Sequence, residues 1–265
     1  MAPVAFLFFY LAMLANAVVF SALGQGGGVL YTPIQLFFGI DFHTAAATTL
    51  FLVMVTSLSS TLVFRKAGVV DWPMALALES TTTLGGFFGG LYSGHFTGRF
   101  LTFLFSGVIA FAAVFMVRTF SGVTCNTRRF YCWQRRLGEE RYAVNLALAL
   151  PISFVAGAVS GLIGVAGGIL KVPMMVLLFG VPMNIAVGSS AFMVGLTASG
   201  GFLGHLRAGH VDWRVALALA PGIFVAGQIG ARKAVKVDKR RMRVWFGYFL
   251  MALAAFLAAR AASAR

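Results

Sequence analysis

Two glycine-rich clusters carry the residues whose type and spacing most clearly indicate a chemical role. The first runs from Gly24 to Gly28 and the second from Gly164 to Gly168, and in both a proline follows five residues after the last glycine. A short apolar segment follows each cluster at once. A helix that begins after such a break presents unpaired backbone N–H groups and the positive end of its dipole, which together favour an anion. The alternative is that the glycines only let helices pack closely.

Hydroxyl side chains follow both clusters. Thr48 and Thr49 lie near the start of the next apolar segment, and Ser189 and Ser190 occupy the corresponding place in the second half of the chain. Their hydroxyls could donate hydrogen bonds to an anion. They could equally bond back to a carbonyl one turn earlier, which is common for such residues in membrane helices. Both interpretations stay open at this point.

The elements that must position these residues are apolar segments. The chain has 265 residues, of which 60% are hydrophobic and 11% charged, and its first Lys or Arg is Arg65. A soluble domain of this size needs more charged surface, so the apolar excess must face lipid. The net charge of +14 lies in short loops between apolar segments, which is typical of cytoplasmic loops rather than of nucleic-acid binding.

A bilayer-spanning helix needs about 20 apolar residues. The long segments of this kind are residues 3–23, 44–64, 72–92, 100–117, 143–163, 184–206, 213–231 and 244–259. Two shorter segments, 29–38 and 169–179, follow the glycine clusters, and each covers only about half a bilayer. Four glycines of segment 72–92 are interpreted as packing glycines, namely Gly85, Gly86, Gly89 and Gly90.

Two charges lie inside apolar segments. Lys171 is part of the short segment after the second cluster, and Glu79 lies within segment 72–92. Intramembrane charges are costly and indicate function by default. Lys171 either neutralises an anionic substrate or extends to an interface. Glu79 carries a proton as a coupling group, pairs with Lys171, or is a structural partner of a threonine or a backbone group.

The two halves of the chain repeat each other. Residues 24–33 match residues 164–173, residues 45–51 match 186–192, and residues 66–72 match 207–213, with an offset of 140 and then 141. The string Ala-Gly-x-Val-Asp-Trp occurs in both halves. The sequence therefore predicts a first transmembrane repeat over residues 1–120, a basic cytoplasmic loop over 121–141 and a second repeat over 142–265. Such duplication is common in secondary transporters, although channels and membrane enzymes also duplicate.

The positive-inside rule predicts how the halves face. If the short segments cross the membrane, each half has five crossings, the halves are inverted, and the Lys and Arg residues other than Lys171 divide 15 to 5 between the two sides. If the short segments re-enter, the halves are parallel and the division is 12 to 8. The stronger asymmetry favours an all-α, polytopic integral membrane protein with two inverted repeats and both termini outside.

Cofactor and metal sites are not predicted. Cys125 and Cys132 both lie in the basic loop, where a cytoplasmic location favours free thiols, and the loop has no His or third Cys to complete a zinc site. The chain also lacks the Gly-x-x-x-x-Gly-Lys-Ser/Thr string of a P-loop, so no ATP site is expected.

The glycine clusters with their prolines, the hydroxyl strings and the two Ala-Gly-x-Val-Asp-Trp strings together resemble the TauE/SafE family of sulfite exporters. The resemblance extends from about Ala17 to the last helix. It implies movement of small sulfur-containing anions, such as sulfite and organosulfonates, across the bacterial inner membrane by a multi-pass protein. The residues that it places beside the substrate are Gly26, Gly27, Gly28, Thr48, Thr49, Gly167, Gly168, Ser189 and Ser190. Ala166 and Thr48-Thr49 depart from the usual pattern of the family, so the two sites are expected to be unequal.

The predicted function is therefore a secondary transporter of small anions, with Lys171 in the substrate site, Glu79 as the coupling residue and protons as the coupling ion. An anion channel of the same architecture is the first alternative. A membrane enzyme would need Ser189 or Ser190 as a nucleophile and His205 as a base, but no third, orienting residue is evident. A divalent-metal transporter would need clustered His and carboxylates inside the membrane, which the sequence lacks.

Overall fold

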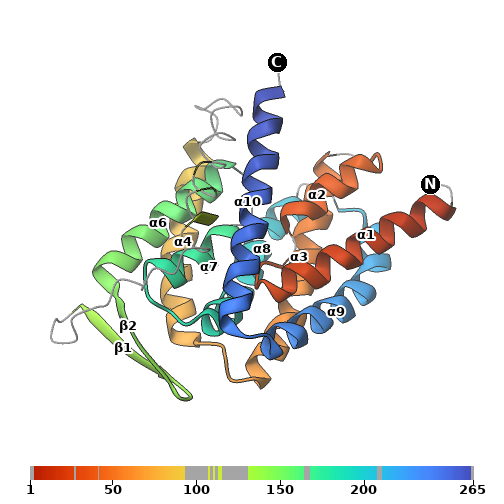
Figure 1. Cartoon of the computed structure of the whole chain (residues 1–265). Coiled ribbons are helices and arrows are strands. Elements are labelled where there is room, and N and C mark those ends of the chain that lie inside the picture. The colour runs from red at the N-terminus through yellow and green to blue at the C-terminus, as the bar shows by residue number, and fades with distance from the viewer. Residues whose placement is uncertain are drawn as a thin grey trace. The chain divides into compact units, whose positions relative to one another are not determined.

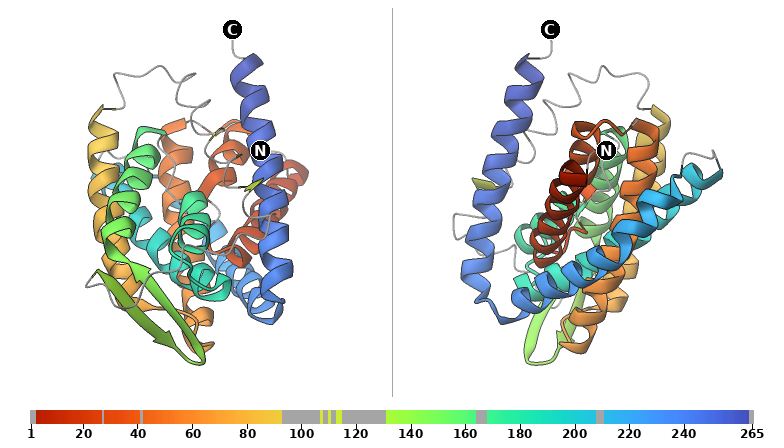
Figure 2. Two further views of the ribbon diagram at one scale, coloured as in Figure 1. Left: turned by 60° about the vertical axis from the view of Figure 1, so that its left-hand side comes forward. Right: turned by 90° about the vertical axis from the view of Figure 1, so that its right-hand side faces the viewer.

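The computed structural model describes residues 3–26, 28–40, 42–92, 131–163, 168–207 and 211–263, together with residues 107, 110, 113 and 114. Most of these residues are helical (Figures 1 and 2). The helices are α1 (Pro3–Ala22), α2 (Gly28–Phe37), α3 (Phe42–Lys66), α4 (Trp72–Tyr92), α6 (Leu146–Ile163), α7 (Gly168–Leu177), α8 (Met183–Arg207), α9 (Trp213–Lys236) and α10 (Lys239–Ser263). The predicted crossing at residues 100–117 falls largely outside the described residues.

Four of the described helices contain stretches that are long and apolar enough to cross a membrane. These stretches are Val4–Ala22, Ala47–Lys66, Met183–Leu203 and Trp213–Lys236. The helical membrane class predicted from the sequence is thereby confirmed.

The prediction of an all-α chain is wrong at one place. β1 (Cys132–Leu137) and β2 (Glu140–Asn145) form an antiparallel hairpin within the basic loop, and α6 begins only at Leu146 (Figure 1). Arg135 and Tyr142 lie opposite each other in its register. More and less exposed residues alternate along β1, as expected for a strand. A charged residue lies on the less exposed face, so the pattern of apolar residues along the sequence does not show this alternation.

The expectation of free thiols is also wrong for Cys132, which is disulfide-bonded. Cys125 lies outside the described residues. Whether two cysteines can be joined depends on the distance and direction of their Cβ atoms, which spacing along the chain does not determine.

The helix bounds recur with the offsets that the motifs have. The short helices α2 and α7 each have 10 residues and start 140 residues apart. The long helices α3 and α8 each have 25 residues and start 141 residues apart. α4 and α9 both start at the Trp of the repeated motif, where the preceding Asp71 or Asp212 accepts a hydrogen bond from a backbone N–H of the first turn. The repeated Asp-Trp pair is thus a helix N-cap.

The chain folds into two compact units, and these units do not coincide with the two halves of the sequence. Unit 1 comprises Met1–Val70 and Val187–Lys236, so it holds α1, α2, α3, most of α8 and α9. Unit 2 comprises Asp71–Ala186 and Val237–Arg265, so it holds α4, the hairpin, α6, α7 and α10. Each unit therefore contains helices from both halves of the sequence.

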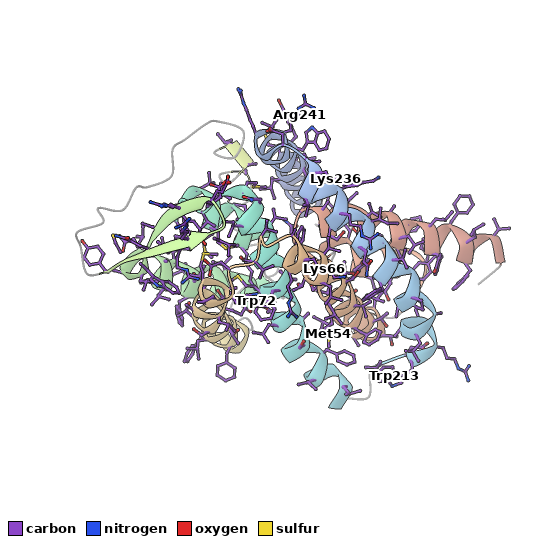
Figure 3. The ribbon with its side chains drawn as sticks, turned by 90° about the horizontal axis from the view of Figure 1, so that it is seen from below. Met54, Lys66, Trp72, Trp213, Lys236 and Arg241 are labelled. Atoms are coloured by element: carbon purple, nitrogen blue, oxygen red, sulfur yellow. The ribbon has the colours of Figure 1, made fainter. Side chains whose placement is uncertain are left out.

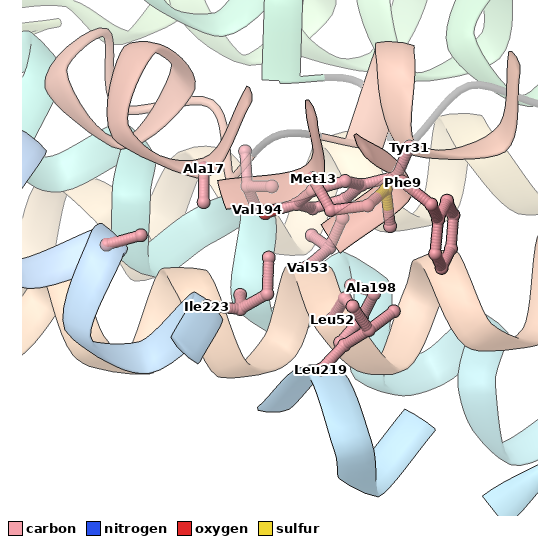
Figure 4. Close-up of a cluster of buried hydrophobic side chains, with 11 residues drawn as sticks. Phe9, Met13, Ala17, Tyr31, Leu52, Val53, Val194, Ala198, Leu219 and Ile223 are labelled. Atoms are coloured by element: carbon pink, nitrogen blue, oxygen red, sulfur yellow. The ribbon is translucent and has the colours of Figure 1, made fainter. Parts of the chain in front are cut away.

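The core of unit 1 lies where four of its long helices meet the short helix α2 (Figure 4). Phe9 and Met13 of α1, Tyr31 of α2, Val53 of α3 and Val194 of α8 are all buried there. Ile223 and Leu219 close the cluster from α9. Figure 3 labels Lys66 and Lys236, the last residues of α3 and α9, and with Figures 1 and 2 it shows that these two helices end at the same end of unit 1.

In unit 2, α4 and α6 pack with their backbones in close contact. A Cβ at Gly85 would meet the carbonyl group of Phe154, and a Cβ at Gly157 would meet that of Thr82. The predicted packing role is confirmed for Gly85. Small residues let two helices approach this closely. A larger residue at either glycine would push α4 and α6 apart.

Candidate functional site

The first glycine break, between α1 and α2, is enclosed within unit 1 by α3 and α8. The Ser190 hydroxyl of α8 donates a hydrogen bond to the carbonyl oxygen of Gly24 at 2.9 Å. Gly26 has a φ of 66°, and a Cβ there would lie 2.7 Å from Oγ of Ser57 on α3. Only glycine adopts that backbone conformation cheaply. The break is therefore held by helices that come from both halves of the sequence.

Two polar side chains at this break are buried without a hydrogen-bond partner. Both atoms of the Gln25 amide and the Ser57 hydroxyl have no partner within the described part of the chain, and the same holds for the Thr48 hydroxyl elsewhere on α3. Gln25 is 2% exposed and Ser57 is 1% exposed. Because an unsatisfied buried polar group costs about 1–3 kcal/mol, a cluster of them calls for an additional partner such as a ligand or water.

Other polar groups near the break are already engaged and tie α2 to α3. The Thr49 hydroxyl accepts hydrogen bonds from Thr32 and from the Gln35 amide, both at 2.9 Å. The Tyr31 and Thr56 hydroxyls lie 3.0 Å apart and share a hydrogen bond. Of the predicted hydroxyl donors, Thr49 thus joins α3 to α2, whereas the Thr48 hydroxyl has no partner among the described residues.

The short helix after the second break lies in unit 2 and carries an ion pair. Lys171 sits in the first turn of α7, and its Nζ atom lies 2.7 Å from Oε2 of Glu79 on α4. The two side chains are 2% and 1% exposed. The Thr83 hydroxyl lies 3.4 Å from the other Glu79 oxygen. Of the roles that the sequence left open for Glu79, the structure contains two, the pair with Lys171 and the contact with a threonine.

Lys171 and Tyr31 occupy equivalent positions in the two halves, since each is the third residue after the glycine that begins α7 or α2. Both side chains are fully buried. One contributes to a neutral hydroxyl pair with Thr56 and the other to an ion pair with Glu79. The two short helices thus differ in charge although they have the same length.

Comparison with known proteins connects this architecture to a family. The family model described as sulfite exporter TauE/SafE matches residues 8–257. The chain belongs to the TauE/SafE family. It is 31% identical over 230 residues to the probable membrane transporter protein YunE of Bacillus subtilis. These residues make up 82% of this chain and 84% of that protein. It is 28% identical over 242 residues to a probable membrane transporter protein of Xylella fastidiosa, covering 89% of this chain and 88% of the relative.

A more distant relative is the probable membrane transporter protein MJ0441 of Methanocaldococcus jannaschii, with 24% identity over 255 residues, 89% of this chain and 89% of that protein. No solved structure matches the chain. The family and the curated relatives together identify a multi-pass membrane transporter.

The hairpin of this TauE/SafE protein is anchored at the Asp-Trp motif of its first half. Arg135 donates two hydrogen bonds to the Asp71 carboxylate, at 2.6 and 2.9 Å, and the Tyr142 hydroxyl donates a third at 2.5 Å. Burial raises the pKa of Asp71, but these donors outweigh burial and hold that pKa below its ordinary value. Burial, followed by the bond to Asp71, raises the pKa of Tyr142. The anchor therefore consists of an ionised carboxylate between Arg135 and a neutral tyrosine.

The predicted substrate residues divide between the two units. Gly26, Thr48, Thr49, Ser189 and Ser190 belong to unit 1, and all five are buried. Gly28 and Gly168 are the first residues of α2 and α7. Gly168 and Lys171 belong to unit 2. Gly27 and Gly167 lie outside the described residues, so their predicted role stays a prediction.

Sequence reasoning missed Gln25 and Ser57. Gln25 is a polar residue inside a glycine cluster, where its counterpart in the second half is Val165. That difference was the signal available in the sequence. Ser57 could not be singled out, because α3 carries several further hydroxyl residues and only the fold brings this one against Gly26. Within the described residues no three His, Cys, Asp or Glu side chains form a group suited to a metal ion.

Proposed function

We propose that this TauE/SafE protein is a secondary transporter of small anions, with sulfur-containing anions such as sulfite and organosulfonates as the substrate class. The observation that carries the proposal is the buried break before α2. There, the unpartnered Gln25 amide and Ser57 hydroxyl accompany the N-terminal end of a helix. Amide, hydroxyl and backbone N–H groups are all hydrogen-bond donors, and together they suit an oxyanion.

The ion pair between Lys171 and Glu79 supports a role for protons in coupling. In the helices α4, α6 and α7 these two residues are the only Lys, Arg, Asp or Glu side chains. Glu79 places a carboxylate beside the first turn of α7, where the positive end of the helix dipole favours an anion. A proton on Glu79 would release the Lys171 ammonium, which would then offer its charge to an anion at a second site, at the start of α7. One proton would thus accompany each anion.

Two inverted five-segment halves fit this transporter, because broken helices in paired repeats are a recurrent design of secondary transporters. The arrangement of unit 1 supports the inverted orientation. α3 and α9 end at the same end of this unit, at Lys66 and Lys236, as five crossings per half require. The basic residues at these helix ends then lie on the cytoplasmic side of a bacterial inner membrane.

Uptake into proteoliposomes tests the proposal. The purified chain should transport sulfite, thiosulfate or an organosulfonate in preference to acetate, and transport should depend on an imposed pH gradient. Ser57→Ala and Gln25→Leu should each weaken binding about tenfold or more, because a hydrogen bond to a charged ligand contributes about 1.5–3 kcal/mol. Ser60→Ala is the matched control, since Ser60 lies one turn further along α3 and its buried hydroxyl bonds back to Thr56 and Ser57 carbonyls.

Transport of none of these anions by a correctly inserted protein would refute the proposed function. The same assay distinguishes the alternative, an anion channel of this architecture. A channel only equilibrates the anion, whereas a proton-coupled transporter accumulates it against its gradient and loses that accumulation in Glu79→Gln. The names of the curated relatives favour the transporter.

A further inference from the structure

A groove of about 420 Å³ lies between α3 and α8 in unit 1. Gly195 and Ser199 of α8 leave room at positions where α3 has Met54 and Leu58. The groove therefore exists because the second repeat has small residues where the first has large ones. Two of the residues that line it are exposed at its rim, Leu58 to 60% and Leu196 to 45%. The groove thus opens onto the apolar surface of the protein.

The wall of this groove offers a ligand only apolar contacts. Among the described residues no charged side chain lines it. The hydroxyls of Ser57 and Thr61 have almost no accessible surface. The Ser199 hydroxyl donates a hydrogen bond back to the carbonyl oxygen of Gly195, at 2.8 Å. Because its polar groups are covered or engaged, the groove suits a hydrocarbon chain and not a small polar ion.

The length of the groove corresponds to one leaflet of a bilayer. Its lining on α3 extends from Phe51 to Thr61, which is about 15 Å along a helix that rises 1.5 Å per residue. The hydrocarbon core of a bilayer is about 30 Å thick, so the acyl chains of one leaflet extend over about 15 Å. An acyl chain that lies along the groove would therefore reach its end where the polar headgroup region begins.

A cation stands just beyond that end of the groove. Phe51, Met54, Leu58 and Thr61 recur every three or four residues, which places them on one face of α3, and Arg65 is the next position of this series. Arg65 lies one turn beyond Thr61 and is exposed. It has no ion-pair partner within the described part of the chain. Its charge is therefore available to an anionic group at the membrane surface.

We propose that this groove is a binding site for an anionic glycerophospholipid of the bilayer, with one acyl chain between α3 and α8 and the phosphate at Arg65. Basic residues beside a membrane surface attract anionic lipids, and the apolar wall gains contacts along the whole chain. A second copy of this protein is less suited to the groove, because its net charge of +14 would bring further cations towards Arg65. The site is independent of the proposed transport of anions.

Native mass spectrometry of the full chain tests this inference. The protein is purified in detergent with an equal mixture of phosphatidylglycerol and phosphatidylcholine that have the same acyl chains. We expect one phosphatidylglycerol to stay bound to each chain. Arg65→Gln should lower the ratio of bound phosphatidylglycerol to bound phosphatidylcholine about fivefold, because one basic residue near an anionic surface contributes about 1 kcal/mol. Ser199→Leu copies Leu58 and fills the groove, so it should lower retention of both lipids.

Two neighbouring residues provide matched controls. Lys66→Gln removes an exposed charge that lies about 100° around the helix axis from Arg65. Gly200→Leu adds the same bulk next to Ser199, at a position where a Cβ meets nothing within 4 Å. Both variants should retain lipid as the wild type does.

Three results would overturn the inference. They are an unchanged lipid ratio in Arg65→Gln, undiminished retention in Ser199→Leu, and a lipid-free dimer of the wild type, which would assign the groove to a second copy. If Ser199→Leu fails to fold, Arg65→Gln decides alone, because it changes only an exposed side chain. None of these results bears on anion transport, which the uptake assay tests separately.

Discussion

The Nζ atom of Lys171 lies 2.7 Å from Oε2 of Glu79, and this buried ion pair joins a helix of the second half of the chain to a helix of the first. At the equivalent places the other half has Tyr31 and Ala220, and Tyr31 instead shares a hydrogen bond with Thr56. The same short helix is thus packed once with an ion pair and once with neutral groups. Since the fold accepts the neutral solution in one half, substitution of both charges can test the coupling role proposed for Glu79 and Lys171.

Removing one partner of this pair should destabilise the protein. Glu79→Ala leaves an uncompensated Lys171 charge in the interior, which costs about 3–5 kcal/mol. The double variant Lys171→Tyr with Glu79→Ala copies the residues of the other half, so it should recover most of that loss. Thermal unfolding in detergent measures both. The recovered variant should also lose dependence of transport on the pH gradient. A double variant as unstable as the single one would show that the pair is structural.

Gly26 should be intolerant of a side chain, because a Cβ meets Ser57 and the backbone conformation is left-handed. Gly26→Ala should therefore abolish anion binding while the protein still inserts. Gly39→Ala separates the two causes. Gly39 also has a positive φ, 79°, but a Cβ there meets nothing within 4 Å, so this variant adds only backbone strain of about 1–2 kcal/mol. Unchanged anion affinity in Gly26→Ala would move the substrate away from the break.

The hairpin anchor should depend on pH through Asp71. Its folded pKa is held below the ordinary value of 3.8, so its stabilising contribution is fully present above that value and is lost as pH falls through the folded pKa. Hydrogen-exchange protection of β1 and β2 should stay constant from neutral pH to about 4 and fall below it.

Two arginine variants test whether the ion pair between Arg135 and Asp71 is responsible for this pH dependence. Arg135→Ala should lower the opening free energy of the hairpin by about 2 kcal/mol at neutral pH, since the bonds to Asp71 are charged and Arg135 is partly buried. Arg136→Ala is the control, because the exposed Arg136 side chain is hydrogen-bonded to the carbonyl oxygen of Gly138. Equal protection in the two variants would contradict the anchor.

The sequence predicts the helices well because length and apolar character are local properties. The predicted segment 72–92 has the bounds of α4, and the two short segments are displaced by one or two residues from α2 and α7. The hairpin was missed because Arg135 finds its partner, Asp71, 64 residues away. The contribution of Ser57 to the site was missed for the same physical reason. Contacts between residues that are far apart in the sequence decide both, and no pattern within one segment reports them.

The orientation of the halves is tested at the two helix ends labelled in Figure 3. Lys66 ends α3 and Lys236 ends α9, and both side chains are exposed. Five crossings per half put them on the same side of the membrane, whereas re-entrant short segments would put them on opposite sides. Lys66→Cys and Lys236→Cys are made in a chain whose two native cysteines are serines. Each is labelled on intact cells with a maleimide that does not cross the membrane, and again after permeabilisation.

We expect both positions to be labelled only after permeabilisation, since the positive-inside rule puts them on the cytoplasmic side. Glu139→Cys, in the turn of the hairpin, adds the basic loop to the comparison. The positive-inside rule puts this basic loop in the cytoplasm, whereas the disulfide at Cys132 favours the opposite side, because disulfides are rare in the cytosol. Labelling of Glu139→Cys decides between these two locations. Labelling of all three positions on intact cells would reverse the orientation but keep the inverted halves. Labelling of Lys66→Cys and Lys236→Cys from opposite sides would exclude inverted halves, because α3 and α9 would then end on different faces of the membrane.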